Sequence, residues 1–385
     1  MPFQGHFNLG GLLPQRLSPQ VKALYWSAVL QNLALGMLLL FEPIYLWQQG
    51  FGLAGIMKFF LAVYTVYFFL APLGANFATR RGFENSIFLS TIFQFIYYVC
   101  LFLIAQSWYW AIPAVALYAL QKSFYFPAYH AYFARYSDET EEGREVGGMS
   151  VSLALVYVAG PLLAGFLLTF GSWFWLFLAG GLILLSSNWP LLRHRPEFTP
   201  RQFPYGAAYK RIFAPVLRRP LLAGLGFGEE LIFMTLWPVF MYVLVVNYAT
   251  VGIFVAVSTL IMAIVTLYVG RLTDTSNKKT VLRVSVLFNQ LGLLGRLIVS
   301  SPFLIFLVDA WTRVTHSMII VPIYAVTYQR AKHQSSMDTA VFFEMTLSLG
   351  KILAALILLT IFTVTTSWGA IWLVAALMAI LYAAL

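Results

Sequence analysis

Three ionisable residues lie close together within an otherwise apolar stretch of the sequence. Asp309, Arg313 and His316 belong to the segment DAWTRVTH, and their i, i+4 and i+7 spacing places them on one face of a helix. The flanking segments SPFLIFLV and SMIIVPIYAV are apolar, so charges there are costly unless they face a cavity or a partner. The pattern indicates a site for substrate or proton coupling. The alternative is a buried Asp309–Arg313 ion pair that only holds helices together.

The composition excludes a soluble globular domain. Of the 385 residues, 61% are hydrophobic and 10% are charged, and the mean hydropathy is +0.80. Because a helix crosses a bilayer with about 20 residues, the chain has room for about a dozen crossings and for no separate catalytic domain. The sequence therefore predicts an all-α polytopic membrane protein that contacts the lipid bilayer.

Apolar runs and their polar breaks predict twelve transmembrane helices. Most of the 24 lysines and arginines then fall in loops on one side, which the positive-inside rule assigns to the cytoplasm together with both termini. The N-terminal tail lacks the pattern of a signal peptide. The net charge of +10 is spread over helix ends, so no nucleic-acid partner is expected. The predicted helices span 24–48, 54–76, 86–106, 109–133, 147–169, 172–192, 221–246, 249–269, 280–300, 303–327, 340–363 and 366–385.

A basic, proline-rich segment at 193–220 divides the predicted helices into two sets of six. We therefore expect a cytoplasmic tail (1–22), an N-terminal six-helix bundle (23–192), a cytoplasmic linker (193–220) and a C-terminal six-helix bundle (221–385). A shift of 195 residues superimposes five unusual positions, and such internal repeats are typical of one group of transporters. The matched pairs are Pro43 with Pro238, Pro127 with Pro322, Tyr129 with Tyr324, Arg135 with Arg330, and Trp173 with Trp368.

The segment GRLTDTSNKK, between the predicted helices 249–269 and 280–300, resembles a loop of the major facilitator superfamily. The family pattern G-x-L-x-D-x-x-x-(R/K)-(R/K) is matched at Gly270, Leu272, Asp274, Lys278 and Lys279. The resemblance implies the major facilitator fold, in which two pseudo-symmetric six-helix bundles enclose a central site. It also implies that this loop latches the cytoplasmic gate.

The equivalent loop of the first half, GANFATRRGFEN, is incomplete. It keeps Arg80 and Arg81, but Ala78 stands where the family has an aspartate. We consider Glu344, at the inner end of the predicted helix 340–363, as a substitute partner for these arginines. Arg135 and Arg330, at equivalent positions of the two halves, are further candidates for a role in conformational change.

The predicted helix 147–169 resembles an element found mainly in antiporters of this superfamily. Its sequence GGMSVSLALVYVAGPLLAG matches the pattern G-x8-G-x3-G-P-x2-G-G at Gly147, Gly160, Pro161 and Gly165, whereas two other glycines are replaced. The resemblance favours the drug:proton antiporter-like members. Small residues also permit close helix packing and proline bends a helix, so a generic packing helix is the alternative.

Further ionisable residues lie in helices that the resemblance implies line the central cavity. These are Glu42, Lys122, Glu229 and Glu230, and Glu42 has the alternative of a solvated acid at the outer rim. Successive helix positions point about 100° apart, so at most one of Glu229 and Glu230 faces the cavity squarely. Burial favours the neutral form of a carboxyl and a nearby cation favours the charged form, so such groups can couple to protons. Glu344 and Lys351 are interpreted as structural.

The leading hypothesis is a secondary transporter that exports a small organic solute by alternating access in exchange for protons. ATP drive is not expected, because no Walker-type phosphate loop is present. A proton-coupled symporter for nutrient import is the nearest alternative. A non-transporting membrane-embedded binding protein and a lipid-modifying enzyme are less favoured, because no catalytic cluster accompanies the charges. We expect a monomer in the cell membrane, with no metal or cofactor.

Overall fold

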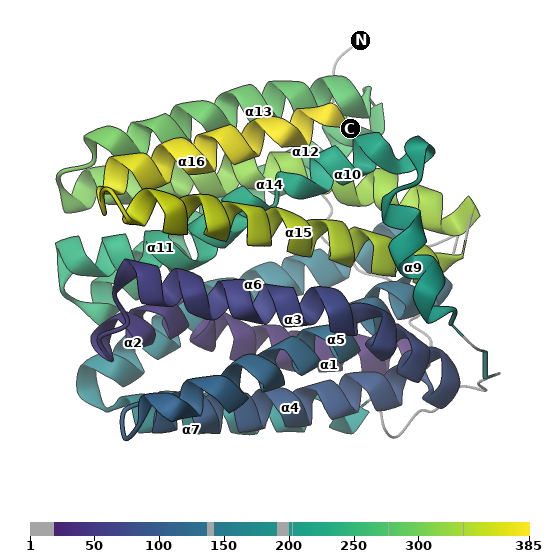
Figure 1. The fold of residues 1–385 in the computed structure, drawn as a ribbon, viewed down its shortest axis with the longest axis horizontal. Helices are drawn as coiled ribbons and strands as arrows, with labels where there is room; N and C mark the ends of the chain where they lie inside the picture. The colour runs from purple at the N-terminus through teal and green to yellow at the C-terminus, as the bar shows by residue number, and fades with distance from the viewer. Residues whose placement is uncertain (1–18, 137–141, 191–199, 202, 276, 334) are drawn as a thin grey trace, which may run out of the picture.

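The computed structural model describes residues 19–136, 142–190, 200–201, 203–275, 277–333 and 335–385. Within these residues the chain forms helices joined by short turns, and the helices run roughly parallel or antiparallel to one another (Figure 1). Helical segments correspond in order to all twelve predicted transmembrane helices. The all-α polytopic fold expected from the sequence is therefore confirmed.

The helices form two sets that lie one above the other in Figure 1. We name the set that precedes α9 the first bundle and the set that follows it the second bundle. The first bundle contains α1 (Pro19–Leu38), α2 (Glu42–Gln48), α3 (Gly52–Arg81), α4 (Phe83–Leu103), α5 (Ala111–Tyr136), α6 (Glu142–Phe170) and α7 (Trp173–Ser186). The short α9 (Tyr205–Ile212) is followed by α10 (Arg218–Leu225), α11 (Gly228–Val245), α12 (Tyr248–Thr275), α13 (Lys278–Gly295), α14 (Pro302–His333), α15 (Ser336–Phe362) and α16 (Trp368–Ile380).

Apolar length agrees with a membrane-spanning role for most of these helices. Eight helical stretches of the described residues are long and apolar enough to cross a bilayer, and three more are apolar but shorter. The helix that matches the fourth predicted crossing, α5, is in neither group. Three consecutive polar residues, Gln121, Lys122 and Ser123, lie near its middle and lower its hydropathy.

Two of the predicted crossings are broken into two helices. The first splits into α1 and α2 at residues 39–41, and Pro43 lies in the first turn of α2. Proline has no N–H to donate to a preceding turn, so it fits the first turn of the new helix. The seventh splits into α10 and α11 at Gly226 and Phe227. Both breaks place acidic residues in the first turn of the second segment: Glu42 in α2, and Glu229 and Glu230 in α11.

Most of the segment 270–279, which we predicted to be a loop, is helical. Helix α12 continues to Thr275 and α13 begins at Lys278, so the connection between them is very short. Asn277 caps α13 by accepting a hydrogen bond from the Lys279 backbone N–H at 3.0 Å. Gly270 and Asp274 belong to α12, but the surroundings of their side-chain positions lie outside the described part of the chain.

The linker contains helical structure that the sequence analysis did not predict. Residues 193–199 and 202 lie outside the described part of the chain, but Tyr205–Ile212 form α9 and α10 begins at Arg218 rather than at 221. The hydroxyls of Tyr205 and Tyr209 donate to the Phe69 carbonyl of α3 at 2.8 and 2.9 Å. Arg211 pairs with Asp338 of α15 at 3.1 Å. Helix α9 therefore contacts both bundles.

The two bundles meet along α6 with α12 and along α3 with α15. Small residues allow this approach, as the resemblance in the fifth predicted helix led us to expect. A Cβ atom on Gly165 of α6 would lie 2.8 Å from the Tyr248 carbonyl oxygen, and one on Gly252 of α12 would collide with the Pro161 carbonyl. Within the first bundle, a Cβ on Gly160 would lie 2.6 Å from the carbonyl carbon of Gly36. Glycine at these positions sets the spacing of the helices.

We predict that Gly160→Ala lowers the thermal stability of the purified protein, because the added methyl group collides with the α1 backbone, which cannot yield as a flexible side chain does. Overpacking of this kind costs about 1–3 kcal/mol. The measurement is the unfolding temperature in detergent. The matched control is Gly206→Ala on α9, where nothing lies within 4 Å of the added Cβ. Equal unfolding temperatures for the two variants would contradict the packing argument.

Candidate functional site

Asp309 and Arg313 form the ion pair that their spacing predicts. Arg313 Nε lies 2.8 Å from Asp309 Oδ2, and the indole N–H of Trp237 on α11 donates to Asp309 Oδ1 at 2.8 Å. Asp309 is 0% exposed. Both carboxylate oxygens therefore have partners, and the pair joins α14 to α11.

A second guanidinium, Arg296, lies close to this pair. It follows α13 directly, is 1% exposed, and stacks with its Cζ 4.3 Å from the centre of the Trp237 ring and 5.2 Å from that of Trp372. Its Nη2 donates to Thr312 Oγ1 at 3.3 Å. Cation–π contact compensates part of the cost of burying this charge. The sequence analysis did not select Arg296, although its position inside the apolar run LGLLGRLIV was a usable signal.

Glu229 and Glu230 diverge, as successive helix positions require. Glu229 Oε2 lies 3.1 Å from His316 Nδ1 on α14, and Glu230 Oε2 lies 2.7 Å from Lys351 Nζ on α15. His316 shares its helix face with Asp309 and Arg313, so the predicted grouping of these three residues is observed. Lys351, which we interpreted as structural, is thus paired with Glu230, which we predicted to be functional.

Phe233 connects two of these ion pairs. Its ring stacks on His316 with centres 5.7 Å apart. The guanidiniums of Arg313 and Arg296 also contact this ring, with Cζ 5.1 and 5.3 Å from the ring centre. Phe233 follows Glu229 and Glu230 by one helical turn, so α11 supplies both carboxylates and the aromatic ring that contacts their neighbours.

A cavity of about 130 Å³ lies between the two bundles, beside Arg313 and Phe233. It is bounded by α1 and α6 of the first bundle and by α11, α12 and α14 of the second. Its other lining residues are mostly apolar, and Pro161 of the predicted gating element is among them. They are Leu35, Gly36, Leu39, Leu40, Tyr157, Pro161, Met234, Pro238, Val255 and Thr259.

Lys122 does not line this cavity. Its Nζ lies 4.3 Å from the Tyr118 ring centre and 5.4 Å from that of Tyr64. Tyr64 also accepts a hydrogen bond from Lys351 Nζ at 3.3 Å, so the two lysines share an aromatic neighbour across the bundle interface. Glu42 is 1% exposed and lies near Tyr97 and Lys122. The alternative of a solvated acid at the outer rim is therefore wrong for Glu42, because the helix break turns its side chain into the protein.

Glu344 does not pair with Arg80 or Arg81, so the substitute-partner interpretation is wrong. Its carboxylate accepts a hydrogen bond from the Tyr67 hydroxyl at 2.8 Å and lies 3.2 Å from His130 Nε2. Arg80 and Arg81 are in the last turn of α3, further along the helix than Glu344 reaches. Glu344 thus joins α15 to α3 and α5. No sequence signal could have identified His130 and Tyr67, because they lie in the other half of the chain.

Polar contacts between the bundles also occur near the opposite ends of the helices. Gln48, at the end of α2, donates to the Tyr242 hydroxyl at 2.8 Å and to the Tyr248 hydroxyl, and it accepts a hydrogen bond from Trp173 Nε1 at 3.0 Å. The bundles are therefore joined by hydrogen bonds at this end through Gln48 and toward the other end through Glu344.

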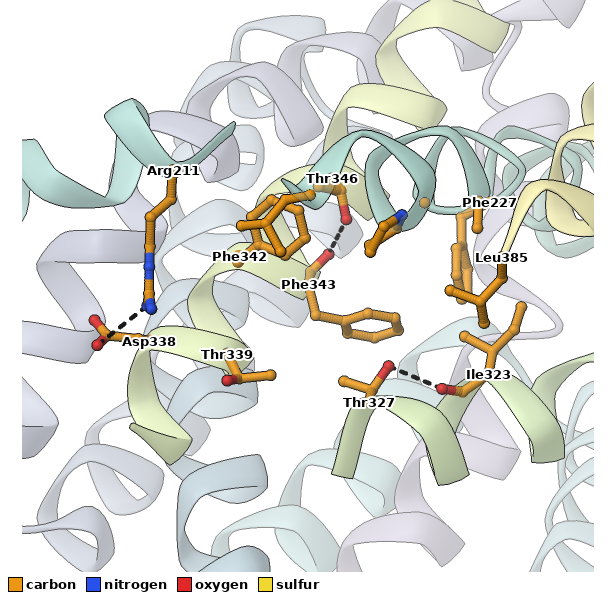
Figure 2. Close-up of a pocket in the computed structure, with 14 residues that line it drawn as sticks. Arg211, Phe227, Ile323, Thr327, Asp338, Thr339, Phe342, Phe343, Thr346 and Leu385 are labelled. Atoms are coloured by element: carbon orange, nitrogen blue, oxygen red, sulfur yellow. Dashed lines mark hydrogen bonds and ion pairs between the residues drawn. The ribbon is translucent and has the colours of Figure 1, made fainter. Parts of the chain in front are cut away.

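A second cavity, of about 40 Å³, lies among α10, α14 and α15 (Figure 2). Phe227, Phe342, Phe343 and Ile323 make it largely apolar, and the Arg211–Asp338 ion pair lies at one side of it. None of the central ion pairs reaches this cavity. The gating candidates Lys278 and Lys279 begin α13, whereas the side chains of Arg135 and Arg330 lie outside the residues described in detail.

We predict that Lys351→Met destabilises the protein by about 3–5 kcal/mol, because it leaves the buried Glu230 carboxylate without its cation. The double variant Glu230→Gln with Lys351→Met recovers most of this loss, because no lone charge remains. Unfolding in detergent measures both. The control is Asp338→Asn, which breaks a pair that is about one-third exposed and costs less than about 1 kcal/mol. A double variant as unstable as Lys351→Met would contradict the pairing.

Comparisons with known proteins relate these features to a family. The family model described as Major Facilitator Superfamily matches residues 24–355. The fold is similar to a crystal structure of a D-xylose-proton symporter, with a TM-score of 0.69, 12% identity and coverage of 94% of this chain and 96% of that one. It is also similar to the xylose transporter XylE from E. coli in a partially occluded inward open conformation, with a TM-score of 0.69, 11% identity and coverage of 95% and 97%. No curated protein sequence matches the chain significantly.

Proposed function

Because the chain belongs to the major facilitator superfamily, a family of membrane transporters rather than enzymes, we propose that it is a proton-coupled secondary transporter of a small organic solute. In this proposal the solute binds between two bundles, at 23–192 and 221–385, which the linker 193–220 connects. The candidate site lies where α1 and α6 meet α11, α12 and α14. The chain acts as a monomer in the cell membrane with both termini in the cytoplasm.

The charge balance of the central ion pairs supports proton coupling. Three carboxylates, Asp309, Glu229 and Glu230, face two permanently charged partners and one imidazole, His316. Histidine is the only one of these side chains whose ordinary titration lies near neutral pH. Protonation of His316 gives Glu229 a directly contacting cation, and loss of the proton leaves Glu229 to the attraction of Arg296, so the charge of the cluster changes by one. A proton carried at His316 and Glu229 is therefore the simplest coupling device here.

The interbundle contacts support alternating access. Glu344 joins the bundles through Tyr67 and His130, and Gln48 joins them toward the opposite ends of the helices. A transporter of this kind opens one end while the other stays closed, so the two groups of contacts break in turn. In this scheme Gly160 and Pro161 hold the helix packing about which the bundles rock, and Arg80, Arg81, Gly270, Asp274, Lys278, Lys279, Arg135 and Arg330 act at the cytoplasmic gate.

For the direction of transport we propose export in exchange for protons, since α6 carries the antiporter-like element with Gly160 and Pro161 at its centre. Import by symport is the second candidate. The observation that favours it is the similarity in fold to a D-xylose-proton symporter. The two differ in the sign of the proton flux that accompanies solute entering a vesicle.

The expected result in proteoliposomes is a protein-dependent proton flux when solute is added outside. With an internal pH dye, exchange makes the interior alkaline and symport makes it acidic. Ethidium, D-xylose and benzenesulfonate serve as cationic, neutral and anionic probes, and empty liposomes correct for leakage. If a probe is transported at a rate that does not depend on an imposed pH gradient, transport is not coupled to protons and this part of the proposal is wrong.

We predict that His316→Gln abolishes gradient-driven accumulation but keeps solute exchange at zero gradient, because the neutral side chain can no longer carry the proton. Both rates are measured with the probe that the wild-type protein transports. Asp309→Asn is expected to reduce both rates, because it leaves the buried Arg313 guanidinium without its carboxylate partner. Lys58→Gln, which removes an exposed cation on α3, is the control that keeps both. Unchanged gradient dependence in His316→Gln would exclude His316 as the proton carrier.

A further inference from the structure

Arg313 presents unused hydrogen-bond donors to the central cavity. Its Nε is held by Asp309, and its remaining contact is with the Phe233 ring. Among the described residues no hydrogen bond or ion pair engages its two terminal amino groups. The side chain is 17% exposed, whereas Asp309 is 0% exposed, so the guanidinium turns its open edge toward the cavity that it lines.

The charge around Arg313 is not balanced by Asp309 alone. Arg296 is buried on the Trp237 ring, and Trp237 donates to the same Asp309 carboxylate that holds Arg313. Asp309 and Glu229, the two carboxylates that act on Arg296, are already engaged with Arg313 and with His316. When His316 is protonated, these two carboxylates face three cations. An uncompensated buried cation is costly, so an anion beside Arg313 would be stabilised.

The other walls of the cavity define the rest of the ligand. Arg313 is the single charged residue among its described lining residues, and most of the others are aliphatic, proline or aromatic. Tyr157 uses its hydroxyl to donate to Asn32 Oδ1 at 2.5 Å. At about 130 Å³ the cavity is smaller than the roughly 300–1,000 Å³ of pockets for drug-sized ligands. The site therefore suits a compact ligand with an apolar body and one anionic end.

We infer that the transported solute is a compact apolar monoanion whose carboxylate-type group binds the two terminal amino groups of Arg313. This inference rests on the transport function proposed above. A planar carboxylate can accept both N–H groups in parallel, which a neutral amide or a cation cannot do. Phe233, Val255 and Leu35 hold the apolar body. The charges of Arg313, Arg296 and protonated His316 exceed those of Asp309 and Glu229, and this excess attracts the anion into the space between the bundles.

The test is ligand-dependent thermal unfolding of the full-length protein in detergent at constant ionic strength. The probes are benzoate, its neutral isostere benzamide and the cation trimethylphenylammonium. Benzoate at about ten times its dissociation constant is expected to raise the unfolding temperature by about 2 °C, because it binds only the folded state. Benzamide and the cation are expected to leave the temperature unchanged.

Variants locate the bound anion. Arg313→Gln is expected to abolish the benzoate effect, and Arg313→Lys to weaken binding at least about tenfold, because an ammonium cannot hold both oxygens. Val255→Phe, which narrows the cavity without changing charge, also weakens it. Arg219→Gln, on the exposed start of α10, is the control with unchanged binding. If Arg313→Gln does not fold, Val255→Phe and the three wild-type probes decide the question.

Stabilisation by benzamide or by the cation equal to that by benzoate overturns the inference, as does no response to benzoate or an undiminished response in Arg313→Gln. These results are separable from a failure of the proposed function. If benzoate binding requires Arg313 but no solute flux occurs in proteoliposomes, the anion site is supported and the transport function is contradicted. If D-xylose or ethidium is transported with protons but no anion binds, the transport function is supported and the inference of an anionic substrate is contradicted.

Discussion

Charge burial in a low-dielectric environment is the constraint on which the second bundle depends. Asp309, Glu229 and Glu230 are each paired with a basic group from another turn or helix. The Glu229–His316 and Glu230–Lys351 pairs join α11 to α14 and α15, and Trp237 joins α11 to Asp309, so these contacts fix how the three helices are rotated about their axes. A lone charge at this depth costs several kcal/mol, so rotation of one helix out of register is strongly opposed. The same pairs that define the site therefore also define the packing of the bundle.

The interface between the bundles is built differently. Along α6 and α12 it consists of close backbone contacts at Gly165 and Gly252, which have no directional bonds to break. Directional contacts occur toward the ends, through Glu344 with its partners Tyr67 and His130 and through Gln48. Lys351 adds one further hydrogen bond, to Tyr64, between α15 and α3. An interface with few directional contacts lets rigid bundles rock, whereas ion pairs along its whole length would hold them in one position.

Features that follow from local geometry could be predicted from the sequence. Hydropathy predicted the twelve crossings, the i, i+4 spacing predicted the Asp309–Arg313 pair, and the rotation of 100° per residue predicted that Glu229 and Glu230 diverge. Contacts between distant segments could not be predicted. The partners of Glu344 depend on how α15 is rotated against α3 and α5, and the aromatic box around Arg296 depends on the meeting of α11 with α16.

The two helix breaks explain why internal symmetry was an incomplete guide to the site. Each half interrupts its first crossing, and each break puts acid at a helix N-terminus, where the helix dipole favours negative charge. In the second bundle these acids find His316 and Lys351. In the first, Glu42 is surrounded mainly by tyrosines, and Lys122 rests on aromatic rings instead of forming a comparable ion pair. The two breaks are not equivalent positions of the repeat, since a shift of 195 residues places Glu42 on Trp237 rather than on Glu229 or Glu230. The paired charges are therefore concentrated in one bundle, beside the cavity.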